Sequence, residues 1–233
     1  MASTMRRIGL LGGMSWESTA LYYRLVNEEV RERLGGFHSA RLVLASVDFA
    51  EVEVMQVAGD WTAAGALLAD EAAALERAGA ECLVLCTNTM HRVADAIEAA
   101  VDIPLLHLAD VTADAVRLAG LDRIALLGTR FTMEQPFYAD RLRSHGIDVL
   151  VPEGDDRTLV HDVIYDELVL GVVREESRAA YVDVVRRLVE RGAQGVVLGC
   201  TEIELLVGPD DVPVPVFATT RLHALAAVDF ALS

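Results

Sequence analysis

The stretch GAECLVLCT at residues 79–87 recurs as GAQGVVLGC at residues 192–200, a constant 113 positions further along the chain. In each copy a short apolar run follows a glycine-led turn and ends in small or polar residues. Residues 8–12 (IGLLG) and 124–128 (IALLG) form a second similar pair. Internal similarity at a fixed offset is the sequence signature of a repeated structural unit. The repeat therefore predicts two units of one α/β topology.

Apolar runs and amphipathic segments alternate outward from these stretches, which is typical of α/β proteins with parallel sheets. We expect two pseudosymmetric Rossmann-like domains with a cleft between them. One domain comprises residues 1–108 plus 217–233, with the final helix packing back on it, and the other comprises residues 109–216. The expected strands are 7–11, 41–47, 82–86, 104–108, 123–127, 148–151, 196–198 and 214–217; the expected helices are 15–34, 62–77, 89–99, 110–118, 134–144, 159–170, 175–190 and 220–232.

Polar residues follow the expected strands in both halves. Parallel sheets bind ligands at the carboxyl ends of their strands, and a helix N-terminus there favours a small anion such as a carboxylate. The same residue types are also ordinary helix caps, so each one alone is weak evidence. Together, we expect them to contact substrate: Met14 and Ser15, Asn88 and Thr89, Thr129 and Thr132, Thr201 and Glu202.

Cys200 lies just after an expected strand and before an expected helix. The positive end of a helix favours a thiolate, so we expect the pKa of Cys200 to be lowered toward neutrality, where it can act as a base. Cys86 and Thr87 are neighbours and point to opposite faces of an extended strand, so only one of them can face a site. Cys82, within the same strand, is expected in the core.

Composition excludes several function classes. The chain of 233 residues carries 20 Lys and Arg against 36 Asp and Glu, a formal charge of −16, which is unsuited to nucleic acid. Three cysteines fit neither a disulfide scaffold nor zinc spacing, so no metal site is expected. No apolar run is long enough to span a membrane, and no signal peptide precedes the first strand. G-x-G-x-x-G and Walker motifs are also lacking. These features predict a reduced, cytoplasmic protein.

Three stretches resemble the aspartate/glutamate racemase superfamily, in its aspartate racemase branch: GLLGGMSWEST at 9–19, TNTMH at 87–91 and GCTE at 199–202. The resemblance covers nearly the whole chain. It implies an amino-acid substrate, no cofactor, a homodimer, and two acid/base residues on opposite sides of the α-carbon. It also implies a polar substrate contact after the second strand, for which Gln56 is the candidate.

The chain departs from the family pattern at the first catalytic loop. The family has Cys-Asn-Thr, whereas Thr87 precedes Asn88 here and Cys86 comes one residue earlier. The internal repeat pairs Thr87 with Cys200, while an inserted residue would restore Cys86 to the site. A second departure is Val169, which stands where aspartate-specific relatives have a lysine for the distal carboxylate; Arg130 is an alternative cation.

The sequence thus predicts a cofactor-independent amino-acid racemase of broad specificity that uses Cys200 with Thr87 or Cys86. The alternatives are a related decarboxylase or cis–trans isomerase acting on a small diacid, or a catalytically inactive amino-acid-binding protein. A hydroxyl at position 87 favours the last of these, because a hydroxyl is a poor base.

Overall fold

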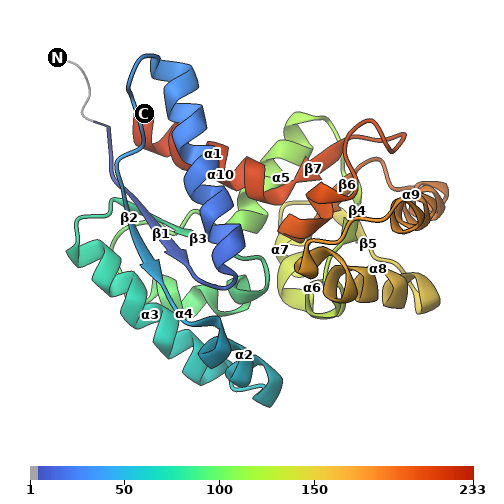
Figure 1. Ribbon diagram of the computed structural model, residues 1–233, viewed down its shortest axis with the longest axis horizontal. Helices are drawn as coiled ribbons and strands as arrows, with labels where there is room; N and C mark the ends of the chain where they lie inside the picture. The colour runs from blue at the N-terminus through green and yellow to red at the C-terminus, as the bar shows by residue number, and fades with distance from the viewer. Residues whose placement is uncertain (1–4) are drawn as a thin grey trace. The chain divides into compact units, whose positions relative to one another are not determined.

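The short apolar runs form the strands of two parallel sheets, as the computed structural model of the protein shows for residues 5–233 (Figure 1). The chain divides into two compact units. Unit 1 comprises Met1–Leu108 and His223–Ser233, and unit 2 comprises Ala109–Leu222. The predicted α/β fold with two parallel sheets is confirmed.

Sheet A of unit 1 has the strand order β2-β1-β3, with β1 (Ile8–Gly12) in the centre. Every residue of β1 and β3 is buried, because helices cover both faces of the sheet. On one face pack α1 and the end of α10 (Thr219–Leu232), and on the other α3 and α4 (Figure 1). The remaining bounds are α1 Trp16–Leu34, β2 Leu42–Ser46, α2 Phe49–Ala58, α3 Trp61–Arg77, β3 Cys82–Leu85, the 3-10 helix η1 Thr89–Val93 and α4 Ala94–Glu98.

Sheet B of unit 2 has the order β5-β4-β6-β7. Helices α8 and α9 pack on the face formed by alternate residues of β4 and β6, around the buried Tyr181. The bounds are α5 Leu108–Leu118, β4 Arg123–Leu127, α6 Arg130–Glu134, α7 Pro136–Ser144, β5 Asp148–Leu150, α8 Gly154–Asp166, η2 Leu168–Leu170, α9 Glu175–Glu190, β6 Val196–Leu198, η3 Thr201–Leu205, β7 Val216–Ala218 and α10 Thr219–Leu232.

The two units repeat one strand arrangement in the same register. In unit 1, β1 pairs β2 and β3, and Gly9 lies opposite Leu83. In unit 2, β4 pairs β5 and β6, and Ala125 lies opposite Val196. The 113-residue repeat aligns Leu83 with Val196, and the similar stretches 8–12 and 124–128 align Gly9 with Ala125. The sequence similarity therefore corresponds to the same hydrogen-bonded frame. Sheet B then adds β7.

Residues 104–108 do not form the expected strand. They make one isolated bridge, Leu83 with Leu105. Pro104 has no N–H to donate. The Leu106 N–H donates to the Leu83 carbonyl oxygen of β3 at 2.9 Å, but the Leu106 carbonyl and the Leu108 N–H bond to the side chains of His223 and His91. The unit boundary also differs from the expected one, because β7 pairs with β6 and residues 217–222 therefore belong to unit 2.

Several helices also differ from the expectation. Residues 89–99 form η1 and the short α4 rather than one helix. Helix α2 was not expected; Asp48 caps its N-terminus by accepting from the Ala50 N–H, and Gly59 ends it in the left-handed conformation. Within residues 5–233, no helix is both long and apolar enough to cross a membrane.

Candidate functional site

The turn between β1 and α1 depends on a glycine that no other residue can replace without strain. Gly13 has φ +97°, and a Cβ at this position would lie 2.2 Å from the Val47 carbonyl oxygen. Its N–H donates to Thr19 Oγ1 at 2.9 Å. Ser15 caps α1 by accepting from the Ser18 N–H, and Met14 is buried in the core of unit 1. The turn thus fixes Ser15 at the carboxyl end of sheet A.

Cys86 and Thr87 have different surroundings. Cys86 is fully buried between sheet A and helices α1 and α10, and its thiol lies 3.6 Å from the Val84 carbonyl oxygen. Burial raises the pKa of the Cys86 thiol far above its usual value. Thr87 follows β3 and is only partly buried. Of the two candidates, Thr87 is therefore the one with side-chain surface outside the core.

The backbone of Thr87 is held by a buried histidine. His91 Nδ1 lies 2.7 Å from the Thr87 carbonyl oxygen, and His91 Nε2 lies 3.2 Å from the Leu108 backbone nitrogen. A carbonyl only accepts and a backbone N–H only donates, so Nδ1 carries the proton and the ring is neutral. Burial lowers the pKa of His91, and the neighbouring His107 and His223 add to this effect.

His223 extends this arrangement to the last helix. Its Nε2 donates to the Leu106 carbonyl oxygen at 2.6 Å, and its Nδ1 accepts from the Tyr22 hydroxyl at 2.9 Å. The rings of His91 and His223 lie 5.8 Å apart, and burial lowers the pKa of His223 to about 4. Neutral histidines thus tie the first loop to the segment 106–108 and to α10.

The other first-unit candidates gather around this loop. Gln56, on α2, donates from Nε2 to Met90 Sδ at 2.9 Å and so contacts the segment just after Thr89. Asn88 is buried at the start of η1, and Thr89 is partly buried. Met14 and Ser15 follow β1, the neighbour of β3. The predicted residues of unit 1 therefore share the carboxyl edge of sheet A.

Cys200 has an environment opposite to the expected one. It precedes η3, a five-residue 3-10 helix, rather than a long α-helix whose dipole would favour a thiolate. Its thiol donates to Glu202 Oε2 at 2.8 Å. Burial raises the pKa of Cys200 well above its usual value, and the negative charge of Glu202 raises it further. The expectation of a lowered thiol pKa was wrong.

The hydroxyls of unit 2 mostly bond to one another. Thr129 caps α6, and its Oγ1 lies 3.3 Å from the Oγ1 of Thr132, which is fully buried. Thr201 Oγ1 lies 3.1 Å from Thr220 Oγ1, in the first turn of α10. Thr129 follows β4 and Cys200 follows the adjacent β6, so both lie at the carboxyl edge of sheet B.

Thr87 and Cys200 occupy equivalent positions in their units. The Cys86 N–H donates to the Leu11 carbonyl at 2.9 Å, and the Gly199 N–H donates to the Leu127 carbonyl at 2.7 Å. Each of these bonds extends the central strand pairing by one residue, and the next residue is Thr87 in unit 1 and Cys200 in unit 2. Cys86 thus corresponds to Gly199, a residue without a side chain.

At position 169, where the family resemblance implies a lysine, the chain has a valine. Val169 lies in η2 and is 55% exposed. Arg174, nearby in sequence, forms an ion pair with Glu167 at 3.4 Å. Arg130 is exposed at the start of α6, and its backbone N–H donates to His161 Nδ1 at 3.3 Å. Val169 therefore presents an apolar side chain where a lysine was the family expectation.

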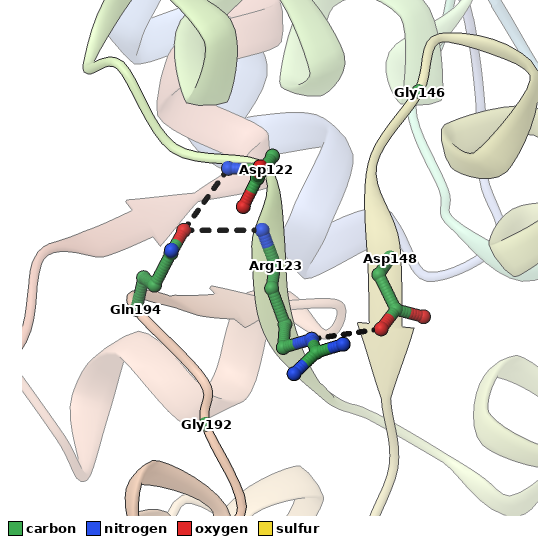
Figure 2. Close-up of a pocket in the computed structure, with 6 residues that line it drawn as sticks. All are labelled: Asp122, Arg123, Gly146, Asp148, Gly192 and Gln194. Atoms are coloured by element: carbon green, nitrogen blue, oxygen red, sulfur yellow. Dashed lines mark hydrogen bonds and ion pairs between the residues drawn. The ribbon is translucent and has the colours of Figure 1, made fainter.

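A polar pocket of about 260 Å³ in unit 2 lies at the other end of the strands (Figure 2). Gln194 Oε1 accepts from the backbone N–H groups of Asp122 and Arg123, and Arg123 pairs with Asp148 at 2.8 Å. Arg123 and Asp148 begin β4 and β5, so this pocket is at the amino edge of sheet B. Its polar groups bond to one another, and it does not contain the predicted residues.

Residues 11–227 match the Asp/Glu/hydantoin racemase family. The chain belongs to this family. A candidate Asp/Glu racemase from Yersinia pestis is 55% identical, covering 98% of this chain and 100% of that one, with a TM-score of 0.95. An aspartate racemase homologue from Pyrococcus horikoshii is 32% identical, covering 98% and 100%, with a TM-score of 0.89. The Picrophilus torridus aspartate racemase, 19% identical over 97% and 94% of the two chains, shares the fold with a TM-score of 0.74.

Sequence reasoning missed the structural roles of His91 and His223. For His91 a signal was present, because a side chain four residues after Thr87 can reach back to its carbonyl across one helical turn. His223 is 117 residues from Leu106, and only the tertiary fold brings the two together. The thiol–carboxylate contact of Cys200 and Glu202 was also missed, since the i, i+2 spacing suggests no contact in a regular helix.

Proposed function

We propose that the protein is a cofactor-independent amino-acid racemase in which Thr87 and Cys200, one from each unit, exchange protons with the substrate α-carbon. The equivalence of these two residues in a repeated backbone frame is the observation that carries the proposal. Membership in a racemase family supports it. Cys86 is left out because its thiol is fully buried.

The α-proton of an amino acid is far less acidic than any protein side chain, so the negative charge that develops must be stabilised. Backbone N–H groups and hydroxyls at strand ends stabilise such charge when they are fixed in advance. Ser15, Asn88 and Thr89 in unit 1, with Thr129 and Thr201 in unit 2, are the residues that we propose for binding the substrate carboxylate. Capping hydrogen bonds at the starts of α1 and α6 hold Ser15 and Thr129 in place, and the contact with Thr220 holds Thr201.

Two features support a broad substrate range. Val169 offers no charge for a distal carboxylate, and Gln56 offers a neutral donor beside the first loop. We therefore propose that aspartate is not strongly preferred over neutral or longer amino acids. The measurement is kcat/KM for L-aspartate, L-glutamate, homoserine and methionine; a hundredfold preference for aspartate would contradict the proposal.

The activity is tested by incubating an enantiopure amino acid with the protein and following the other enantiomer by chiral chromatography. We expect the opposite enantiomer to appear with the wild-type protein and not with Cys200→Ala. Equal turnover by Cys200→Ala would remove Cys200 from the mechanism. Tight binding of an amino acid with no turnover would favour a binding protein, for which the hydroxyl of Thr87 and the raised thiol pKa of Cys200 are the supporting observations.

Assembly and location are further parts of the proposal. Trp16, Tyr23 and Leu44 of unit 1 are apolar and 46–68% exposed, which supports a homodimer that covers them. Sedimentation velocity tests this, and a monomer at micromolar concentration would contradict it.

Cys82, Cys86 and Cys200 are all free thiols, which supports a reducing compartment such as the cytoplasm.

A further inference from the structure

The hydrogen bond between Cys200 and Glu202 places a carboxylate beside the thiol that must become a thiolate in the proposed racemase reaction. Cys200 acts as a base only after its thiol has lost a proton. The thiol donates that proton to Glu202 Oε2, at 2.8 Å. If the proton left for solvent instead, a thiolate and a carboxylate would remain in contact, with two negative charges in a partly buried place.

We propose that Glu202 accepts the Cys200 proton, so that thiol and carboxylate act as one acid/base pair rather than Glu202 contacting the substrate. This inference rests on the proposed function. In the first step the S–H bond breaks and an O–H bond forms on Glu202, giving a thiolate beside a neutral carboxyl group. The net charge of the pair stays at −1 in this step, and the unfavourable pairing of two anions never forms.

The thiolate then takes the substrate α-proton. The Cα–H bond breaks, its electron pair stays on carbon, and a new S–H bond forms while Glu202 keeps its proton. The pair now holds two protons and has no charge. In the reverse direction the thiol returns its proton to the carbon, and the resulting thiolate recovers the proton of Glu202. In the racemisation, the Thr87 hydroxyl donates its proton to the other face of the carbon, and the proton that the pair has gained returns to Thr87 through solvent, so every proton is accounted for.

A second carboxyl group stands beside this pair. Glu204 lies two residues further along η3, and its Oε1 is the buried side-chain oxygen, within residues 5–233, that has no hydrogen-bond partner. Burial raises the pKa of Glu204 to about 7, against the opposing charge of Arg221, and Glu202 raises it further. Glu204 therefore carries an exchangeable proton near neutral pH, close to the carboxyl group that must gain and lose one.

The alternative roles of Glu202 make opposite predictions. If Glu202 only repels the thiolate, its neutralisation should lower the thiol pKa and speed up α-proton exchange. If it only holds the thiol in place, the amide oxygen of Glu202→Gln should do the same and leave the rate unchanged. If it accepts the proton, Glu202→Gln should slow the exchange although the thiol pKa falls, because general-base assistance is typically about 10²- to 10⁴-fold.

The experiment compares wild type, Glu202→Gln and Glu202→Asp, with Glu190→Gln as a matched control. Glu190 ends α9, before β6, whereas Cys200 follows β6, so the control removes a carboxylate at the other edge of sheet B. Exchange is followed by NMR in D2O from pH 6 to 10. The pKa of the Cys200 thiol is measured from the pH dependence of its alkylation rate with iodoacetamide. Mass spectrometry identifies which cysteine is alkylated, and Cys82 and Cys86 should not react because they are fully buried.

We expect Glu202→Gln to lose at least about 100-fold in kcat at pH 7.5 with KM within about threefold. Its residual rate should rise with pH through the measured thiol pKa, Glu202→Asp should recover part of the rate, and Glu190→Gln should match wild type. An unchanged or faster Glu202→Gln overturns the inference and leaves the proposed function standing. If the wild-type protein exchanges the α-proton of no amino acid, both the inference and the proposed function are wrong.

Discussion

The neighbours Cys86 and Thr87 provide the sharpest test of how the first loop is assigned. Cys86→Ala removes one sulfur atom from a fully buried position between sheet A, α1 and α10. Loss of that packing should cost roughly 1–2 kcal/mol of unfolding free energy. For a chain of this length the corresponding fall in Tm is about 2–4 °C per kcal/mol. The rate of α-proton exchange should stay close to that of wild type, since the sulfur has no surface outside the core.

Thr87→Ala should show the reverse pattern. Its side chain is partly exposed, so the unfolding free energy should change by only about 0.5 kcal/mol, while α-proton exchange should fall by about 100-fold or more. Thr87→Cys should raise the rate, because a thiol is a far better base than a hydroxyl. Urea denaturation and NMR in D2O measure the two quantities. An inactive but folded Cys86→Ala beside an active Thr87→Ala would refute the assignment.

Three further predictions concern the surroundings of the site. Val169→Lys should raise kcat/KM for aspartate about 10- to 150-fold relative to methionine, by adding a charge-assisted hydrogen bond; no change in the ratio would separate η2 from the substrate. Gly13→Ala should cost more than about 2 kcal/mol, because its Cβ meets the Val47 carbonyl, whereas Gly35→Ala, with φ +72° and open space, should cost about 1 kcal/mol; equal urea midpoints would contradict this. Burial lowers the pKa of His223 from 6.5 to about 4, so as the pH falls the unfolded chain takes up this proton before the folded protein does. The free energy of unfolding is therefore unaffected by this residue above pH 6.5 and decreases by roughly 3 kcal/mol between pH 6.5 and pH 4. His223→Gln should flatten the decline between pH 6.5 and 4.5 in urea denaturation, and an unchanged slope would assign it to other groups.

The sequence was sufficient for the features that depend on local pattern and repetition. The alternation of apolar runs and amphipathic helices predicted the two parallel sheets, and the match between residues 79–87 and 192–200 predicted a shared frame for Thr87 and Cys200. These features are local because each apolar run is itself a strand, and its flanking glycines mark where the strand begins or ends.

Features that depend on tertiary contacts were not predictable. Residues 104–108 have the composition of a strand, but the Leu106 carbonyl bonds to His223 and the Leu108 N–H bonds to His91. The pKa of Cys200 was expected to be lowered, yet burial and Glu202 raise it. In each case a distant or irregularly placed side chain decides the outcome, and no periodic pattern in the sequence records such a contact.

The most direct test of the racemase assignment is loss of the α-proton signal in D2O, measured by NMR for a panel of enantiopure amino acids. We predict that wild-type protein exchanges the α-proton of at least one of them without added cofactor, and that Cys200→Ala exchanges none while keeping the wild-type unfolding midpoint. Failure of the wild-type protein to exchange any α-proton, or exchange at the wild-type rate by Cys200→Ala, would contradict it.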